Sequence, residues 1–310
     1  MTENKPRPPA PRRAVRRLRV GTLVALVVAL AATLVIAALA RRTLPVNAVA
    51  ANATPRSAHS AAAAPAAKAG SELASLRSAS TPTEARKMEL PTYTVLRTPR
   101  PITVDGVLDE PVWRRLKPVG AFVVEGGSPA EFETEAKLCW DDKHLYVAFS
   151  CIDNDIWGTY TKCDDPLYEQ EVCEIFINPS GDLVNYYEFE VSPRNVVWDG
   201  RIYNPDGARS KNFRGEPEWN CEGLLTGVRV AGTLDDRSDL DQVWTVEMAI
   251  PFAQLVKRPP TDRERWRANL YRIDRGEKDE YSSWSATLTD KPDFHVPKRF
   301  GTLIFSAREA

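Results

Sequence analysis

The sequence contains few of the residues on which common catalytic centres depend. Its 310 residues include only three histidines, three methionines and five cysteines. The cysteines form no C-x-x-C pair and have no zinc-site spacing, and the G-x-S-x-G motif of serine hydrolases is missing. Neither G-x-G-x-x-G nor a Walker A loop is present, so no motif for a nucleotide cofactor is found. These absences give little support to Ser-His-Asp catalysis or to nucleotide chemistry.

The folded part of the chain has an excess of negative over positive charge. The formal net charge is −1, but residues 1–19 carry +6 and residues 41–90 carry +4, which leaves −11 for residues 91–310. An acidic domain repels a phosphate backbone, so we expect no nucleic-acid partner.

A single long hydrophobic run occupies residues 20–40 and holds no charged residue. At 1.5 Å per residue it would just cross a hydrocarbon layer of ~30 Å. More Lys and Arg precede it than follow it, so we expect a basic cytoplasmic tail over 1–19 and an exported C-terminal part. We predict a single-pass transmembrane signal anchor in a bacterial inner membrane; the alternative is a signal peptide cleaved near Ala50–Ala53, which would give a secreted protein.

Residues 41–90 are rich in Ala, Pro, Ser and Thr and contain few large apolar side chains. Such a composition predicts a disordered linker. Residues 91–310 then form one folded domain.

Apolar and polar residues alternate through the domain in short runs bounded by Gly, Pro, Asp and Asn. This pattern predicts strands, most clearly at 144–153, 171–179, 185–193 and 243–252. Many short strands and little helix predict an all-β sandwich or barrel. Four tryptophans lie within strongly periodic segments and are expected in the core: Trp113, Trp140, Trp244 and Trp266.

Several segments occur in an order that resembles the family 9 carbohydrate-binding modules, in their bacterial family-9-like branch. They are PITVDGVLDEPVWRRL at 101–116, AKLCWDDKHLYVAFSCID at 136–153, EVCEIFINP, YYEFEVSP, VWTVEMAIPFAQL at 243–255, WRANLYRI at 266–273 and FHVPKRFGTLIF at 294–305. The resemblance covers nearly all of residues 95–306. It implies an antiparallel, jelly-roll-like β-sandwich that binds a poly- or oligosaccharide, with structural calcium and with glycoside hydrolases as associated proteins.

In that family two aromatic rings clamp the sugar, and the matching places here hold Tyr168 and Phe294 instead of tryptophans. The family's polar contacts match Glu174, Glu190 and Ser192, where Glu190 and Ser192 replace an arginine and an asparagine. Flat aromatic surfaces suit the C–H faces of a sugar ring. Trp284 lies beside a loop and is a further candidate.

Read from the strand pattern alone, Glu174 is flanked on its own face by Val172 and Phe176, so its carboxylate needs a partner. We predict Arg272 for that partner, as a structural ion pair or as part of the ligand site. Glu188 and Glu247 are left open between a solvated sheet face and a functional role.

Acidic pairs in loops suggest where calcium would bind in an exported domain. The best candidates lie in one loop region and comprise Asp153, Asp155, Asp164 and Asp165. Asp141–Lys143 is better explained as a hairpin turn. A disulfide between Cys163 and Cys221 is conceivable, and the odd number of cysteines leaves at least one thiol outside any internal pair.

Three alternatives to simple sugar binding remain at this level. The first is a glycoside hydrolase that uses two of the sheet carboxylates. The second is a haem-binding sandwich with Met248 and His295 as ligands, although the absence of C-x-x-C-H excludes covalent attachment. The third is a structural domain whose sugar site has decayed.

Overall fold

The computed structural model describes residues 89–310, which form a nearly all-β domain. The predicted tail, anchor and most of the linker, residues 1–88, lie outside the described residues. Within 89–310, no helix is both long enough and apolar enough to span a bilayer.

Thirteen strands make up the described part of the chain. Their bounds are β1 (Thr92–Arg97), β2 (Val123–Val124), β3 (Thr134–Trp140), β4 (His144–Ile152), β5 (Val172–Asn178), β6 (Asn185–Val191), β7 (Val197–Tyr203), β8 (Arg214–Glu216), β9 (Leu225–Ala231), β10 (Val243–Pro251), β11 (Arg265–Arg275), β12 (Asp279–Ser283) and β13 (Gly301–Glu309). The short helices are α2 (Pro111–Arg115) and α3 (Phe252–Leu255), with 3₁₀ turns at Leu167–Glu169 and Pro297–Arg299. The four strands that the alternation predicts most clearly are confirmed as β4, β5, β6 and β10.

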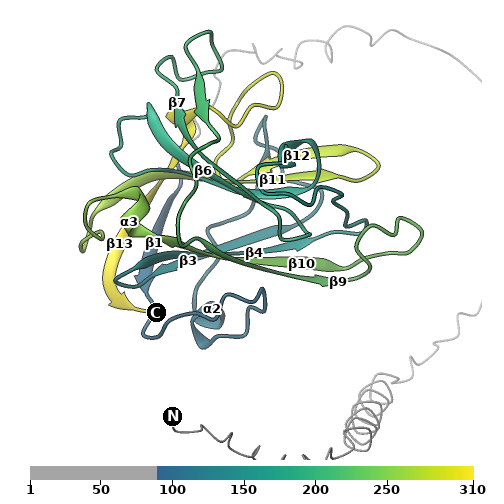
Figure 1. Ribbon diagram of the computed structural model, residues 1–310, viewed down its shortest axis with the longest axis horizontal. Coiled ribbons are helices and arrows are strands. Elements are labelled where there is room, and N and C mark those ends of the chain that lie inside the picture. Colours follow the sequence, from purple (N-terminus) through teal and green to yellow (C-terminus); the bar gives the residue numbers. More distant parts are fainter. Residues whose placement is uncertain (1–88) are drawn as a thin grey trace, which may run out of the picture. The chain divides into compact units, whose positions relative to one another are not determined.

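The strands are hydrogen-bonded in the order β8-β7-β6-β5-β11-β13-β1-β3-β4-β10-β9, with β12 beside β11. We call β5, β6, β7, β8, β11 and β12 the first layer, and β3, β4, β9 and β10 the second layer; β13 and β1 connect them (Figure 1). The expectation of a purely antiparallel sandwich is wrong in one respect, because β1 pairs in parallel with both β13 and β3. The sheet is therefore mixed.

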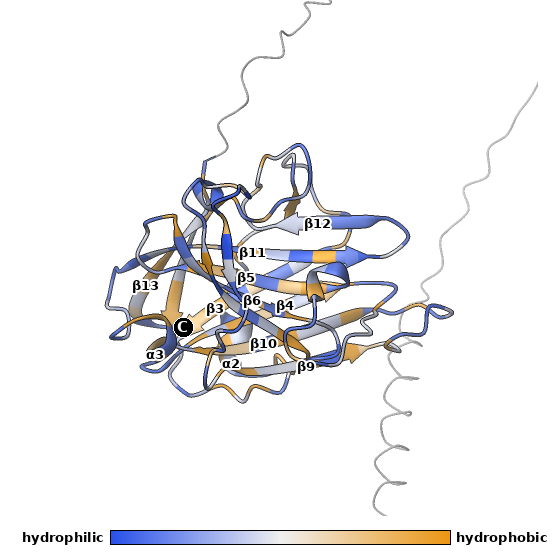
Figure 2. Ribbon diagram, turned by 45° about the horizontal axis from the view of Figure 1, so that its top comes forward, coloured by the Kyte–Doolittle hydropathy of each residue, from blue (hydrophilic) through white to orange (hydrophobic). Residues whose placement is uncertain are grey.

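The main core lies between the two layers. Inward-facing side chains of β4 and β10 pack against those of β5, β6 and β11, including Phe149, Val246, Ile175, Phe189 and Leu270. The expected core tryptophans are all buried: Trp113, Trp140, Trp244 and Trp266. In Figure 2 the connection between β11 and β12 is coloured hydrophilic, as expected for a segment that projects from the core.

Each layer also buries part of its outer face. On the second layer, α2 and the segment before it cover Tyr146 and Ala148. On the first layer, residues near 294–300 cover Phe176, Tyr186 and Tyr271. The hairpin between β3 and β4 turns where it is predicted, since Asp141 Oδ1 accepts hydrogen bonds from the N–H groups of Lys143 and His144, both at 2.7 Å.

Candidate functional site

The outer face of the first layer gathers three glutamates from two adjacent strands. Strand register places Glu174 on β5 opposite Glu190 on β6 and opposite Tyr271 on β11. Glu188 lies two residues before Glu190 and so points to the same side. Their carboxylate oxygens lie within 4.8 Å of one another.

All three glutamates are buried, with at most 5 % of each residue exposed. Glu190 Oε2 has no hydrogen-bond partner. His295 Nε2 lies 3.9 Å from Glu188 Oε2, and the His295 ring is held by Tyr186, whose hydroxyl oxygen is 2.8 Å from Nδ1. The possibility that Glu188 lies on a solvated face is therefore wrong, because the 294–300 segment covers this part of the sheet.

Burial and mutual repulsion govern the charge of this cluster. Desolvation, followed by the charge of neighbouring glutamates, raises the pKa values of Glu174 and Glu190 well above the usual range. Burial raises the pKa of Glu188 to about 8, opposed by the positive charge of Arg209. Burial and Arg209 hold the pKa of His295 well below its ordinary value, so the imidazole is neutral. Without a ligand, the cluster is largely protonated at neutral pH.

A cavity of about 190 Å³ opens above these carboxylates and reaches the surface. It is lined by Tyr168, Glu174, Phe176, Glu188, Glu190, Arg209, Ile273, Arg275, Tyr281, Pro292, Asp293, Phe294 and His295. We call it the glutamate pocket.

The two predicted clamp residues differ in exposure, although both line the glutamate pocket. Tyr168 is 50 % exposed, whereas Phe294 is 8 % exposed. The Phe294 ring stacks on Tyr271, with centroids 4.2 Å apart and an interplanar angle of 15°. One face of Phe294 is thus occupied by the protein, and Tyr168 offers the freer aromatic surface.

The predicted pairing of Arg272 with Glu174 is wrong. Arg272 is opposite Cys173 in the β5–β11 register, so its side chain points between the layers while Glu174 points outward. Arg272 Nη2 instead donates to Asp153 Oδ2 at 2.7 Å and to Asp274 Oδ2 at 2.9 Å. Arg272 is only 1 % exposed, so a ligand in the glutamate pocket cannot reach its side chain.

Two other predicted ligand residues have structural contacts. Trp284 is 4 % exposed, packs in the main core and donates from Nε1 to the Val119 carbonyl at 2.9 Å. Ser192 Oγ accepts the N–H of Val196 at 3.2 Å in the turn after β6. Neither residue lines the glutamate pocket, because Trp284 packs inward and the chain turns at Ser192.

The four aspartates proposed as calcium ligands do not converge. Asp153 faces Arg272, and Asp155 forms an ion pair with Arg237. Asp165 Oδ2 accepts the N–H groups of Thr161 and Lys162. Asp164 lies instead with Cys163 and Asp199. The four positions are close in sequence, but the loop directs their side chains to different neighbours.

Asp153 belongs to a different carboxylate cluster that the sequence did not reveal. Asp153, Glu171 and Asp274 have carboxylate oxygens within 4.8 Å of one another, and all three are buried. Neither carboxylate oxygen of Glu171 accepts a hydrogen bond from an N–H or a hydroxyl group. Burial, together with the charge of Asp153 and a hydrogen bond to its carboxylate, raises the pKa of Glu171 to about 10. Three carboxylates beside the single cation of Arg272 are a donor set that suits a hard cation such as Ca²⁺.

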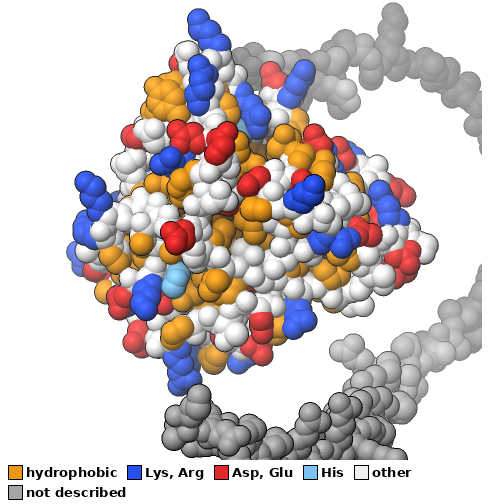
Figure 3. Space-filling view, in the orientation of Figure 1, with side chains coloured by type: hydrophobic (Ala, Val, Ile, Leu, Met, Phe, Trp, Pro, Cys, Tyr) orange, Lys and Arg blue, Asp and Glu red, His pale blue; other side chains and the backbone are white. Residues whose placement is uncertain are grey.

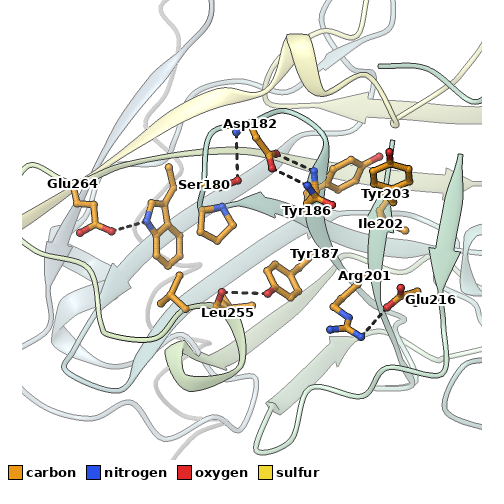
Figure 4. Close-up of a pocket in the computed structure, with 14 residues that line it drawn as sticks. Ser180, Asp182, Tyr186, Tyr187, Arg201, Ile202, Tyr203, Glu216, Leu255 and Glu264 are labelled. Atoms are coloured by element: carbon orange, nitrogen blue, oxygen red, sulfur yellow. Dashed lines mark hydrogen bonds and ion pairs between the residues drawn. The ribbon is translucent and has the colours of Figure 1, made fainter. Parts of the chain in front are cut away.

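A second, larger hollow of about 510 Å³ lies at the ends of β6, β7 and β11 (Figure 4). Its polar groups largely bind one another. The Tyr187 hydroxyl donates to the Leu255 carbonyl at 3.2 Å, and Arg201 pairs with Glu216 at 2.8 Å. Glu264 accepts from Trp266 Nε1 at 3.1 Å. The hollow offers fewer unpaired polar groups to a ligand than its size suggests.

Glu247, on the outer face of the second layer, has a structural role that sequence alone left open. Its carboxylate accepts hydrogen bonds from Trp113 Nε1 at 2.8 Å and from the N–H groups of Asp105 and Gly106 at 3.0 and 2.9 Å. Burial raises its pKa to about 7, and these three donors oppose the rise. The solvated-face interpretation is wrong here too.

Met248 and His295 are separated by the first layer. Met248 packs in the core between the layers, whereas His295 packs against Phe176 and Tyr186 on the outer face. This arrangement does not present the two residues as a pair of axial ligands.

One family model matches nearly all of the domain that the structure describes. Residues 104–308 match the family described as carbohydrate family 9 binding domain-like. The chain belongs to this family. Of the solved structures, one from Bacteroides uniformis that has been proposed to bind carbohydrate has 16% sequence identity and a TM-score of 0.54, covering 70% of this chain and 100% of that one. The likeness shows the shared fold.

Two relatives of this family-9-like domain each match about half of the chain. An extracellular protein of Arthroderma benhamiae is 27% identical over 56% of this chain and 78% of its own length. Endo-1,4-beta-xylanase A of Thermoanaerobacterium saccharolyticum is 26% identical over 49% of this chain but only 11% of the xylanase. The similarity thus covers a small part of that enzyme.

Proposed function

We propose that this family-9-like domain binds a saccharide in the glutamate pocket and has no catalytic activity of its own. The observation that carries the proposal is the combination, in one opening, of a half-exposed aromatic ring at Tyr168 and a floor of carboxylates. A ring surface accommodates the C–H face of a sugar, and carboxyl groups hydrogen-bond its hydroxyls. Membership of the family supports the same assignment.

The volume of the glutamate pocket limits the size of its ligand. A volume of about 190 Å³ is below the ~300–1,000 Å³ of most small-molecule sites. It favours one sugar unit, such as a chain end, over an extended polysaccharide segment. Figure 3 shows acidic and basic side chains interspersed over one face of the domain.

Isothermal calorimetry of the full chain in mild detergent against a panel of oligosaccharides tests the proposal. We expect Tyr168→Ala to weaken binding at least tenfold. Tyr203→Ala is the matched control, because Tyr203 is 47 % exposed and lines the larger hollow instead. Unchanged affinity in Tyr168→Ala, or a loss confined to Tyr203→Ala, contradicts the assignment.

We further propose that residues 20–40 anchor the domain outside a bacterial inner membrane, with residues 41–90 as a spacer. The charge bias around the apolar run supports this orientation. Glycoside hydrolases are proposed partners, because matching segments occur in xylanases. Carbonate extraction of membranes and N-terminal sequencing test the anchor: release of a chain that begins near Ala50–Ala53 would show cleavage instead.

We also propose that Asp153, Glu171 and Asp274 hold a structural Ca²⁺, with Arg272 beside them. When bound, the ion supplies positive charge that the buried cluster lacks. Its support is the buried Glu171 carboxyl group, which meets the carboxylate of Asp153 but no N–H or hydroxyl donor.

A further inference from the structure

The floor of the glutamate pocket consists of three buried carboxyl groups. Three carboxyl groups approach within 4.8 Å of one another, and Glu190 Oε2 has no hydrogen-bond partner although Glu190 is 1 % exposed. A buried acceptor without a donor costs about 1–3 kcal/mol. The carboxyl groups of Glu188 and Glu190 share a hydrogen bond, but Glu190 Oε2 receives no hydrogen bond from an N–H or a cationic group.

The charged groups around the pocket do not supply that donor. The titratable groups that line it are Tyr168, Glu174, Glu188, Glu190, Arg209, Arg275, Tyr281, Asp293 and His295. Arg209 is paired with Asp293 at 3.6 Å, and Arg275 with Asp279. His295 is neutral, for the reason given above. Both arginines are thus paired with an aspartate, and neither donates a hydrogen bond to the three glutamates, although the charge of Arg209 lowers their pKa values.

The rim adds the second half of a cation site. The half-exposed Tyr168 ring lines the same opening, and aromatic faces attract cations that lie over them. The Tyr281 ring already carries Arg275, 4.9 Å from its centroid, and Phe294 is stacked on Tyr271. A carboxylate floor below one free aromatic surface suits an organic ammonium group on a ring that carries hydroxyls. A divalent metal ion could bind the carboxylates at the floor, but the aromatic ring at the rim offers it no ligand atom.

We propose that the glutamate pocket recognises an amino sugar, a hexosamine with a free ammonium group, in preference to a neutral hexose or its N-acetyl form. The inference rests on the proposed function, since it names the saccharide class for the same pocket. The ammonium group lies at Glu174, Glu188 and Glu190 and donates to Glu190 Oε2. Because the empty cluster holds protons, binding of the cation displaces at least one of them to solvent.

Three ligands with the same β-1,4-linked backbone separate the possibilities: chitosan trimer, with ammonium at C2; cellotriose, with hydroxyl; and N-acetylchitotriose, with an amide. Calorimetry uses the full chain at pH 6.5, with EDTA and again with 2 mM Ca²⁺. We expect the chitosan trimer to bind at least tenfold more tightly than either neutral trimer. Added salt should weaken the chitosan trimer alone.

Glu190→Gln provides the charge test, because it keeps the shape of the side chain. We expect a loss of at least fivefold for the chitosan trimer and a smaller loss for cellotriose, whose hydroxyls the amide of the variant can still bind. Glu247→Gln is the control, since that glutamate lies on the other layer and should change neither affinity. A further test uses the wild type alone. Calorimetric titration in two buffers of different ionisation enthalpy should show proton release on binding of the chitosan trimer and not on binding of the neutral trimers.

The outcomes are distinct. Cellotriose or N-acetylchitotriose binding as tightly as the chitosan trimer overturns the amino-sugar assignment and leaves saccharide binding in place. If calcium abolishes binding of the chitosan trimer to the wild type but not to Glu171→Gln, the calcium acts through the other acidic cluster and the inference stands. If calcium competes equally with the chitosan trimer in the wild type and in Glu171→Gln, the three glutamates of the pocket bind the metal and the inference fails. No binding of any trimer, or of the wider panel, overturns the proposed function itself.

Discussion

The sulfur atoms of Cys151 and Cys173 lie 3.2 Å apart in the core, although Cys151 is on β4 in the second layer and Cys173 is on β5 in the first. Both thiols are fully buried, and no disulfide is formed by the cysteines of the described residues. The two layers therefore meet at a pair of thiols in contact.

We expect these two thiols to form a disulfide when the protein folds in the presence of glutathione disulfide, before the core closes. Two protein thiols are oxidised and glutathione disulfide is reduced to two glutathione thiols. A disulfide that closes a loop of this length stabilises a domain by about 3 kcal/mol. Intact mass should fall by two hydrogens, and three free thiols should remain in denaturant. Cys173→Ser should show neither change; five free thiols in the oxidised wild type would contradict the prediction.

The glutamate pocket makes stability depend on pH. The folded pKa of Glu188 is about 8 and those of Glu174 and Glu190 are raised, so the folded state binds more protons than the unfolded state. The contribution of these glutamates to stability is therefore complete below the unfolded pKa of ~4.3 and is lost as pH rises toward and through 8. Thermal melts between pH 5 and 8 should show a falling Tm, and Glu190→Gln should flatten the slope. A Tm that rises over this interval would contradict it.

Calcium should raise the Tm, and by more at higher pH, because Glu171 must lose its proton to bind the ion. At a concentration 100 times the Kd the expected stabilisation is about 2.7 kcal/mol. Glu171→Gln should abolish the shift. Asp165→Asn, in the loop first proposed for calcium, should retain it. Equal Tm shifts in the two variants would show that calcium does not bind at Asp153, Glu171 and Asp274.

Glu247 should matter for stability and not for sugar binding. Glu247→Ala leaves Trp113 Nε1 and the N–H groups of Asp105 and Gly106 without their acceptor, each at a cost of about 1–3 kcal/mol. We expect a clear drop in the urea midpoint at pH 7.5. Calorimetry at a temperature where the variant is folded should give the wild-type affinity. Loss of binding with unchanged stability would assign Glu247 to a ligand site instead.

The alternation of apolar and polar residues was sufficient to predict β4, β5, β6 and β10, because each strand has one face on the core. It also placed Glu174, Glu188 and Glu190 away from that core. It could not tell how far the outer face is covered, since the covering residues near Phe294 come more than 100 positions later in the chain. For that reason Glu188 could not be distinguished from a solvated residue.

Loop residues were harder to assign. Trp284 and the aspartates of the 153–165 region were chosen because binding and metal ligands are common in loops. In the structure Trp284 points inward to Val119, and Asp153 points to Arg272. Glu171, which completes the second acidic cluster, carried no signal in the sequence, since a glutamate beside a strand is ordinary.

The sequence by itself determined the all-β class, the acidic folded domain and its family, because strand periodicity, charge and motif order are local or additive properties. Only the tertiary structure decided which carboxylates meet. Strand register sent Arg272 to the interior and Glu174 to the exterior, and neighbouring strands brought Glu174 to Glu190. Register and burial are set by contacts between distant segments, and those contacts fix the charge and the chemistry of the pocket.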